Sequence, residues 1–130
     1  LNIDMVGRID ENYKEDGNYI FTIGSDYLSS DLHNISENTA KTYHPELKID
    51  YNINAKDYPE QLYYRSDHIK FAEKGVPVIF YTSGDHDDYH TPTDDVEKIN
   101  FEAMEKRVRL VFATAWELAN RENRIVVDKK

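Results

Sequence analysis

The sequence predicts a single α/β domain with a largely parallel β-sheet, and three observations support this. Four short runs rich in β-branched and aromatic residues are typical of strands. Segments with apolar residues at helical spacing alternate with these runs. At 130 residues the chain is long enough for one hydrophobic core and too short to expect two. Alternating strands and helices favour helices packed against a sheet in which neighbouring strands run parallel.

The four predicted strands cover residues 1–6, 19–23, 47–53 and 76–82. The polar segment 10–18 contains Gly17 and predicts a hairpin-type connection between the first two strands. Asp4 lies within the first strand among apolar neighbours. A carboxylate is expensive to bury there unless it is paired or coordinated.

Three helices are predicted. The first covers residues 26–43 with Ser25 as its N-cap, and the second covers residues 66–75. Ser66 is the expected N-cap of the second helix and Gly75 its left-handed C-terminal cap.

The third predicted helix covers residues 101–121 and is the clearest, because its apolar residues recur at three- and four-residue spacing. We expect these residues to form a single buried face: Phe101, Met104, Val108, Val111, Phe112, Ala115 and Leu118. Residues 121–130 form a charged tail. We expect a single domain over residues 1–130 that includes this tail.

Charge and cysteine content exclude several classes of function. The net charge of −9 argues against nucleic-acid binding, because the phosphate backbone would be repelled. The absence of cysteine excludes disulfides and thiolate metal sites. A metal would need His, Asp or Glu ligands, which suit zinc, manganese, magnesium or calcium. No apolar run approaches the roughly 20 residues that span a bilayer, so no membrane span is expected.

The loop from Gly84 to Asp95 concentrates the residues that could bind a metal, with two histidines and five aspartates. It follows a predicted strand directly, where ligands gather in sheets of this kind. His90 is the strongest candidate metal ligand, with Asp94 as a candidate hydrogen-bond partner for its second ring nitrogen. The alternative is that His90 only stabilises the turn.

The other candidates also have ordinary structural interpretations. A solvated loop role is favoured for His86, Asp87 and Asp88. Asp4 could be a ligand or could cap a neighbouring helix.

Two more charged residues also have competing interpretations. Asp94 and Glu97 form an Asp-x-x-Glu capping pattern. Arg65 could bind a carboxylate through two parallel hydrogen bonds, although a surface ion pair is the default.

Other active-site patterns are weak or missing. A calcium-binding loop over residues 85–95 would need a glycine in its middle and a glutamate at its end, and neither is present. The sequence contains no Gly-x-Ser-x-Gly nucleophile elbow and no glycine loop that would bind phosphate.

Four motifs, taken in order, resemble one family. They are Asn2-Ile3-Asp4-Met5-Val6-Gly7-Arg8, Arg65-Ser66-Asp67-His68 with Phe71 and Gly75-Val76-Pro77, Tyr89-His90-Thr91-Pro92-Thr93-Asp94, and Lys98-Ile99-Asn100. Their order and spacing resemble the co-catalytic zinc aminopeptidases, the family of bacterial double-zinc aminopeptidases and glutamate carboxypeptidase. The resemblance implies a three-layer α/β sandwich of the zinc exopeptidase type, with a mixed, mostly parallel sheet, of which this chain would be a C-terminal portion.

The resemblance also implies roles for individual residues. Asp4 would bind one zinc ion and His90 the other, in a site that holds two. Tyr89 would donate a hydrogen bond to the developing oxyanion, and Arg65 would contact the peptide substrate. In such a site the two metal ions polarise the scissile carbonyl and lower the pKa of a bridging water. A glutamate would be the general base and a phenol would stabilise the oxyanion.

The chain departs from the family pattern in one respect. The remaining ligands of the family come from a His-x-Asp motif and a Glu-Glu pair upstream of the strand that carries Asp4, and this chain has no adjacent glutamates. His86-Asp87-Asp88 has the letters of the first motif but lies in the wrong half of the fold. We therefore expect a C-terminal portion of a zinc aminopeptidase that needs the upstream half of the same catalytic domain. Alone, it should be inactive and bind zinc weakly.

The expected compartment of the parent enzyme is secreted or periplasmic, which rests only on where members of the family often act. The alternative function is a non-catalytic binding or receptor domain of the same fold, such as that of the transferrin receptor. The presence of Asp4, Tyr89 and His90 favours a catalytic parent. Aminopeptidase, carboxypeptidase and cyclase activities all remain compatible with these residues.

Overall fold

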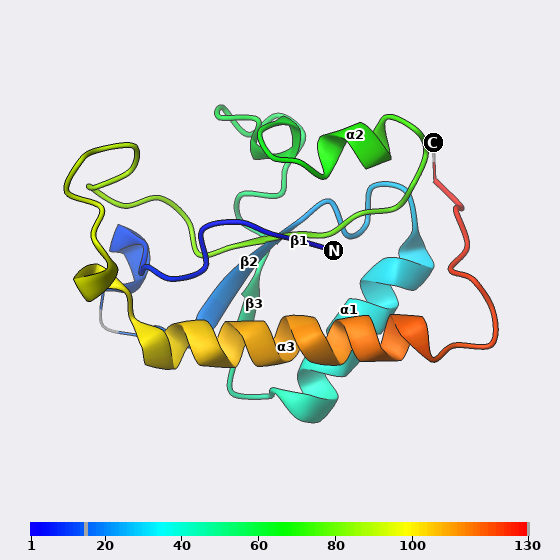
Figure 1. Ribbon diagram of the computed structural model, residues 1–130. Coiled ribbons are helices and arrows are strands. Elements are labelled where there is room, and N and C mark those ends of the chain that lie inside the picture. Colours follow the sequence, from blue (N-terminus) through cyan, green and yellow to red (C-terminus); the bar gives the residue numbers. More distant parts are fainter. Residues whose placement is uncertain (15, 130) are drawn as a thin grey trace.

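The structure is a computed structural model that describes residues 1–14 and 16–129. At its centre is a four-stranded sheet in the order β1-β4-β2-β3 (Figure 1). The strands are β1 (Asn2–Ile3), β2 (Tyr19–Ile23), β3 (Lys48–Asp50) and β4 (Phe80–Thr82). β1 pairs with β4 and β2 pairs with β3 in parallel, whereas β2 and β4 are antiparallel. The sheet is therefore mixed, as the family resemblance implied.

All four predicted strands occur, and β2 has the predicted bounds. The first strand is shorter than predicted, because Met5 adopts a left-handed backbone conformation (φ 59°) that turns the chain out of the sheet. Asp4 consequently lies just after β1 and not within it. The predicted hairpin across residues 10–18 is wrong, since β4 lies between β1 and β2. Residue 15 of that segment lies outside the described residues.

The helices are α1 (Ser30–Tyr43), α2 (Ile69–Ala72) and α3 (Phe101–Ala119). Both predicted N-caps are wrong. Ser29 caps α1, with its Oγ accepting a hydrogen bond from the Leu32 N–H, while the Ser25 Oγ lies 2.9 Å from the His33 Nδ1.

α2 is only one turn long and has His68 at its N-cap position. The hydroxyl of Ser66 is used elsewhere, as described below. Gly75 has the predicted left-handed φ of 76°.

The single buried face predicted for α3 is wrong. The buried residues of α3 are Ala103, Arg107, Leu110, Val111 and Thr114. Of the predicted set, Phe101, Val108 and Phe112 are exposed. α3 therefore has apolar residues on two faces, one of which packs inside the molecule while the other is uncovered.

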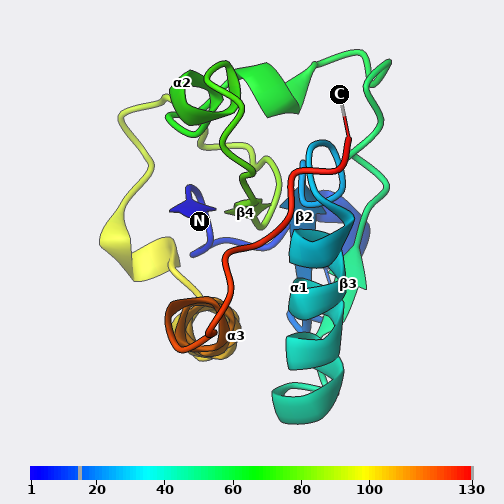
Figure 2. The ribbon, with the colours of Figure 1, turned by 90° about the vertical axis from the view of Figure 1, so that its right-hand side faces the viewer.

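Both faces of the sheet are covered. α1 and α3 lie side by side on one face, and α2 lies on the other (Figure 2). The core beneath α1 and α3 includes Ile20, Leu32, Ile79, Tyr81 and Leu110. The core on the α2 side includes Ile23, Tyr63, Val78 and Phe80, with Ile69 packed against it. The complete three-layer sandwich of the zinc exopeptidases stays a prediction.

The predicted tail folds back toward the start of α1 (Figure 1). The Asp128 carboxylate accepts a hydrogen bond from the Ser30 N–H at 2.8 Å, which satisfies a free donor at the first turn of α1. Arg121 forms an ion pair with Asp31 at 3.3 Å, and Ile125 packs against the core. Residue 130 lies outside the described residues. No helix among the described residues is long and apolar enough to cross a membrane.

Arg107 on α3 is fully buried and bonds two segments that are remote from it in sequence, residues 6–8 and 17–19. Its Nε donates to the Tyr19 carbonyl at 2.9 Å, and its Nη1 donates to the carbonyls of Val6 and Arg8 at 2.8 and 2.7 Å. Its Nη2 donates to the Gly17 carbonyl at 3.2 Å, and the guanidinium lies over the Tyr19 ring. Burial lowers the pKa of Arg107, but from so high a value that the group stays charged.

We predict that Arg107→Met destabilises the chain by about 3 kcal/mol or more, because several buried carbonyls lose their donor at once. Urea unfolding should show a lower midpoint with an unchanged slope. The matched control is Arg109→Met, since Arg109 is exposed and its one side-chain partner among the described residues is Glu105 on the same helix. Its effect should stay within about 0.5 kcal/mol. Equal losses in the two variants would show that Arg107 is not the structural link described here.

Candidate metal and catalytic site

Asp4 lies at the carboxyl end of β1, with its backbone N–H donating to the Tyr81 carbonyl of β4 at 3.1 Å. Its side chain is exposed, and one carboxylate oxygen accepts a hydrogen bond from the Ser66 Oγ at 2.7 Å. The Asn2 side chain in turn donates to that hydroxyl at 2.8 Å. The partner of Asp4 is thus a side-chain hydroxyl and not the N–H of a helix, so the capping alternative for Asp4 is wrong. Ser66 orients the carboxylate.

His68 helps to position Asn2, whose side chain donates to the Ser66 hydroxyl. It is buried, its ring stacks on Phe80, and its Nε2 lies 2.7 Å from the Tyr63 carbonyl. Burial lowers the pKa of His68 and thereby favours the neutral ring at pH 7. A carbonyl can only accept, so the proton is on Nε2, which leaves Nδ1 to accept from the Asn2 amide at 3.4 Å. His68 therefore helps to hold Asn2.

Tyr89 and His90 lie on the loop that follows β4. Their rings stack with centroids 3.9 Å apart and planes 20° from parallel. His90 has a φ of 55°, a left-handed conformation that is uncommon outside glycine. The side chain of His90 is exposed. This geometry places a phenol directly beside an accessible imidazole.

Arg8 lies in the segment that follows β1, and its guanidinium binds two carboxylates of the loop that carries Tyr89 and His90. It donates to the Asp88 carboxylate at 2.5 Å and to Asp94 at 2.7 Å. Lys98 and Thr93 also donate to Asp88, at 2.5 and 2.7 Å. The Arg8 hydrogen bond is the main reason that the pKa of Asp88 lies far below its usual value, and Lys98 and Thr93 add to the effect. We call this group of residues the Arg8 cluster.

The Arg8 cluster overturns two expectations and bears on a third. Asp88 is not a solvated loop residue, since its side chain is only 14% exposed and is paired with Arg8 and Lys98. One Asp94 oxygen accepts a hydrogen bond from Arg8, and the role of Asp94 beside His90 stays a prediction. The Asp94–Glu97 capping pattern is also wrong, because the short turn that follows has Asp95 at its cap position and no side-chain cap.

His86 differs from its expected role as well, whereas Asp87 is exposed as expected. The His86 side chain is only 7% exposed, and its Nε2 lies 3.8 Å from an Asp94 oxygen. Its Nδ1 is buried without a hydrogen-bond partner among the described residues. His86 is therefore a packed loop residue and not a free metal ligand.

The sheet brings the two candidate ligand segments to one end, where β1 and β4 both finish. β1 and β4 are parallel neighbours, so Asp4 and the loop after Thr82 leave the sheet at the same end. The backbone N–H and the hydroxyl of Ser83 both donate to the Met5 carbonyl, at 2.8 and 2.7 Å. This end carries a carboxylate and an imidazole, which are ligands that zinc accepts.

The candidate residues do not complete a metal site by themselves. Within residues 1–14 and 16–129, no three side chains of His, Asp or Glu are arranged to hold one ion. A zinc ion usually takes four ligands.

Arg65 follows the short helical turn Leu62–Tyr64 and is exposed. Its guanidinium forms no ion pair with another described residue, so the surface ion pair that was its default interpretation is not formed here. A free guanidinium can still bind a carboxylate from another molecule.

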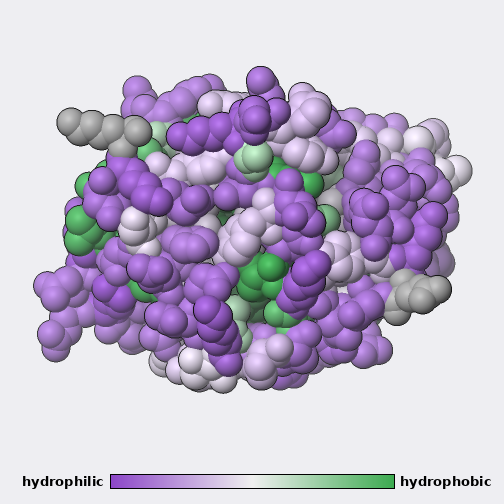
Figure 3. All heavy atoms as spheres, turned by 180° about the vertical axis from the view of Figure 1, so that it is seen from behind, coloured by the Kyte–Doolittle hydropathy of each residue, from purple (hydrophilic) through white to green (hydrophobic). Residues whose placement is uncertain are grey.

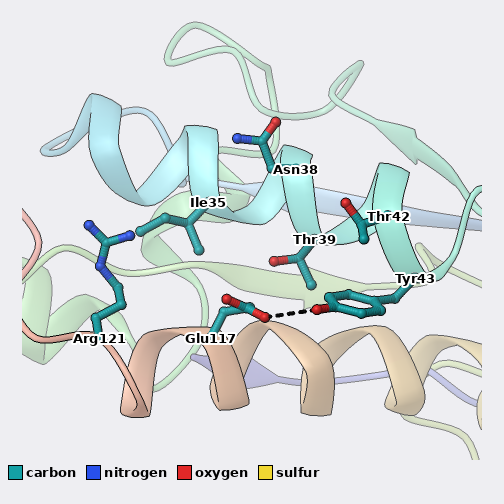
Figure 4. A pocket seen from close by; sticks show the side chains of 7 residues that line it. All are labelled: Ile35, Asn38, Thr39, Thr42, Tyr43, Glu117 and Arg121. Atoms are coloured by element: carbon teal, nitrogen blue, oxygen red, sulfur yellow. Dashed lines mark hydrogen bonds between the residues drawn. The ribbon is translucent and has the colours of Figure 1, made fainter.

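A groove of about 230 Å³ lies between α1 and α3, away from these residues (Figure 4). It is lined by Ile35, Asn38, Thr39, Thr42, Tyr43, Glu117 and Arg121. The Tyr43 hydroxyl donates across it to Glu117 at 3.1 Å. None of the candidate site residues lines this groove, so we do not assign the chemistry to it.

We predict that the Asp88 carboxyl group stays ionised through the range in which an ordinary aspartate titrates, near pH 3.9. A carboxyl pKa that is lowered on folding stabilises the fold above the unfolded value, and this contribution is lost only as the pH falls through the lower folded value. Arg8→Met should raise the midpoint toward 3.9, as measured on the carboxyl carbon by NMR. Arg109→Met should leave it unchanged. An ordinary Asp88 midpoint in the unmutated chain would contradict the pairing.

The chain matches the family model of Peptidase family M28 over residues 1–115. Among solved structures it is similar to the LapA aminopeptidase of Legionella pneumophila, at 26% sequence identity and a TM-score of 0.68. The similarity covers 93% of this chain and 31% of the LapA chain, so the chain spans about a third of that structure. No match was found among curated protein sequences. Because the family model matches most of its length, the chain belongs to Peptidase family M28, the co-catalytic zinc aminopeptidase family.

Proposed function

We propose that this chain is the C-terminal portion of the catalytic domain of a zinc-dependent aminopeptidase. One observation carries the proposal: Asp4 and the loop with Tyr89 and His90 follow adjacent parallel strands and reach the same end of the sheet. Family membership supports the hydrolysis of peptide bonds, and the similarity to an aminopeptidase supports cleavage at the N-terminal end of a peptide. A secreted or periplasmic location is part of the proposal and rests on the family alone.

Each residue has a role that its surroundings allow. Asp4 presents a carboxylate whose position is held by Ser66, and His90 presents an exposed ring nitrogen, so each can bind one of two zinc ions. When bound, the zinc ions would polarise the scissile carbonyl and make an attacking water more acidic. Tyr89, stacked on His90, can donate its phenolic hydrogen to the oxyanion, and Arg65 can bind a substrate carboxylate.

The parts that this chain lacks define its expected partner. The general base and the remaining ligands would come from the upstream half of the same catalytic domain, because the described residues include no group of three side chains that could hold a metal ion. The isolated chain would then bind a peptide poorly and hydrolyse none. The active unit is the longer polypeptide that contains both halves.

The test uses that longer polypeptide and an aminoacyl p-nitroanilide substrate. We predict that Asp4→Asn and His90→Gln each lower kcat/KM by more than about 100-fold, and that Ser66→Ala lowers it about 10- to 100-fold by releasing the Asp4 carboxylate. His44→Gln is the matched control and should retain activity, since His44 lies at the end of α1 and pairs with Glu46. Full activity of the Asp4 and His90 variants would refute the proposed roles. A polypeptide without peptidase activity would instead favour a binding or receptor domain.

A further inference from the structure

The groove between α1 and α3 carries two opposite charges that do not pair with each other. Glu117 lies in the last turn of α3 and Arg121 follows the helix, and both side chains line the groove (Figure 4). The Glu117 carboxylate accepts a hydrogen bond from the neutral Tyr43 hydroxyl at 3.1 Å and has no cationic partner among the described residues. The carboxylate charge is therefore not neutralised within the described part of the chain.

The Arg121 guanidinium has donors to spare. Its Nη2 lies 3.3 and 3.4 Å from the two Asp31 oxygens, longer than the roughly 2.7–3.2 Å of a typical N–H···O hydrogen bond. A guanidinium has five N–H donors, and the Arg121 side chain is 35% exposed. An incoming carboxylate can therefore reach it without competing for a strong internal ion pair.

The space between the two charges is small and partly apolar. Ile35 and Thr39 point from α1 toward α3, between Arg121 and Tyr43 (Figure 4), and both are buried. Ile35 offers an apolar surface, and Thr39 adds a hydroxyl that can donate or accept a hydrogen bond. The groove has a volume of about 230 Å³, which is below the roughly 300–1,000 Å³ of pockets that hold drug-sized ligands. It therefore suits a smaller molecule.

The surroundings of the groove favour a charged ligand. α3 hides part of α1 in Figure 1, so α1 lies toward the rear of the molecule, as Figure 2 also shows. Seen from behind, the surface is mainly hydrophilic, with only small apolar areas (Figure 3). Large exposed apolar patches mark protein–protein contacts. The hydrophilic character of this side favours a small polar molecule over an apolar protein surface.

We propose that this groove binds a free α-amino acid with an aliphatic side chain. Arg121 binds its carboxylate, since a guanidinium pairs with a carboxylate through two parallel hydrogen bonds. Glu117 accepts hydrogen bonds from its ammonium group, and Ile35 contacts its side chain. A molecule with both charges satisfies both groups, whereas a simple anion or cation leaves one of them without a partner.

The assignment does not depend on the proposed function, because none of the candidate metal-site residues lines the groove. It adds to that function in one respect. An aminopeptidase releases free amino acids, so the ligand of this groove would belong to the same class as the product.

The test is an NMR titration of the isotopically labelled 130-residue chain with L-leucine. We predict saturable shifts of the Ile35 and Thr39 methyl groups and of the Arg121 Nε. N-acetyl-leucine lacks the ammonium group and leucinamide lacks the carboxylate. Each should bind about tenfold or more weakly than leucine, because one charged hydrogen-bonding partner is lost. Absence of saturable shifts up to the solubility limit of leucine would overturn the proposal, and so would equal binding of the two analogues and leucine.

Substitutions assign the two charges. Glu117→Gln keeps an acceptor for the Tyr43 hydroxyl but removes the charge, so it should weaken leucine binding about tenfold or more and abolish the preference for leucine over N-acetyl-leucine. Arg121→Gln should do the same for leucine over leucinamide. The matched controls are Glu105→Gln and Arg109→Gln, which change an ion pair of α3 outside the groove.

Urea midpoints show whether each variant is folded. Leucine binding that falls equally in the groove variants and in the controls would contradict the assignment, and so would shifts that map outside the groove. Because the measurement is binding to the chain itself, its result does not depend on peptidase activity.

Discussion

The hydrogen bonds of the buried Arg107 guanidinium are the interactions on which the rest of the structure depends. It bonds carbonyls at the start of β2, at Gly17 and in the segment just after β1. A buried charge is tolerated only where hydrogen bonds replace its hydration, and backbone carbonyls of residues 6–8 and 17–19 do so here. Because both segments are remote from α3 in sequence, Arg107 links α3 to the sheet and fixes where the chain leaves β1.

The same link extends to the candidate site. Arg107 holds the carbonyl of Arg8, and the Arg8 side chain holds Asp88 and Asp94 on the loop with His90. Asp4 is held separately, through Ser66. Two polar networks, one through Ser66 and one through Arg8, thus hold the ligand segments at one end of the sheet. Neither network includes the His90 ring. This leaves the histidine free to bind an ion.

Much of the fold could be predicted because local patterns determine it. The alternating strands and helices occur in the predicted order, and β2 has the predicted bounds. The α3 core face could not be predicted, since apolar residues line two faces of that helix and spacing alone does not say which is covered. Arg107 was also missed, because its partners are backbone carbonyls about 90 or more residues away, which leave no signal in side-chain patterns.

In the candidate site, the motifs located Asp4 and His90, whereas the roles of Ser66 and Asp88 depend on tertiary contacts. By the function proposed above, this chain holds one ligand for each of two zinc ions and completes neither site. The most direct measurement is the zinc content of the purified 130-residue chain, by elemental analysis after equilibration with micromolar zinc and desalting. We predict far less than one zinc ion per chain. Tightly bound zinc in a whole-number ratio would contradict it.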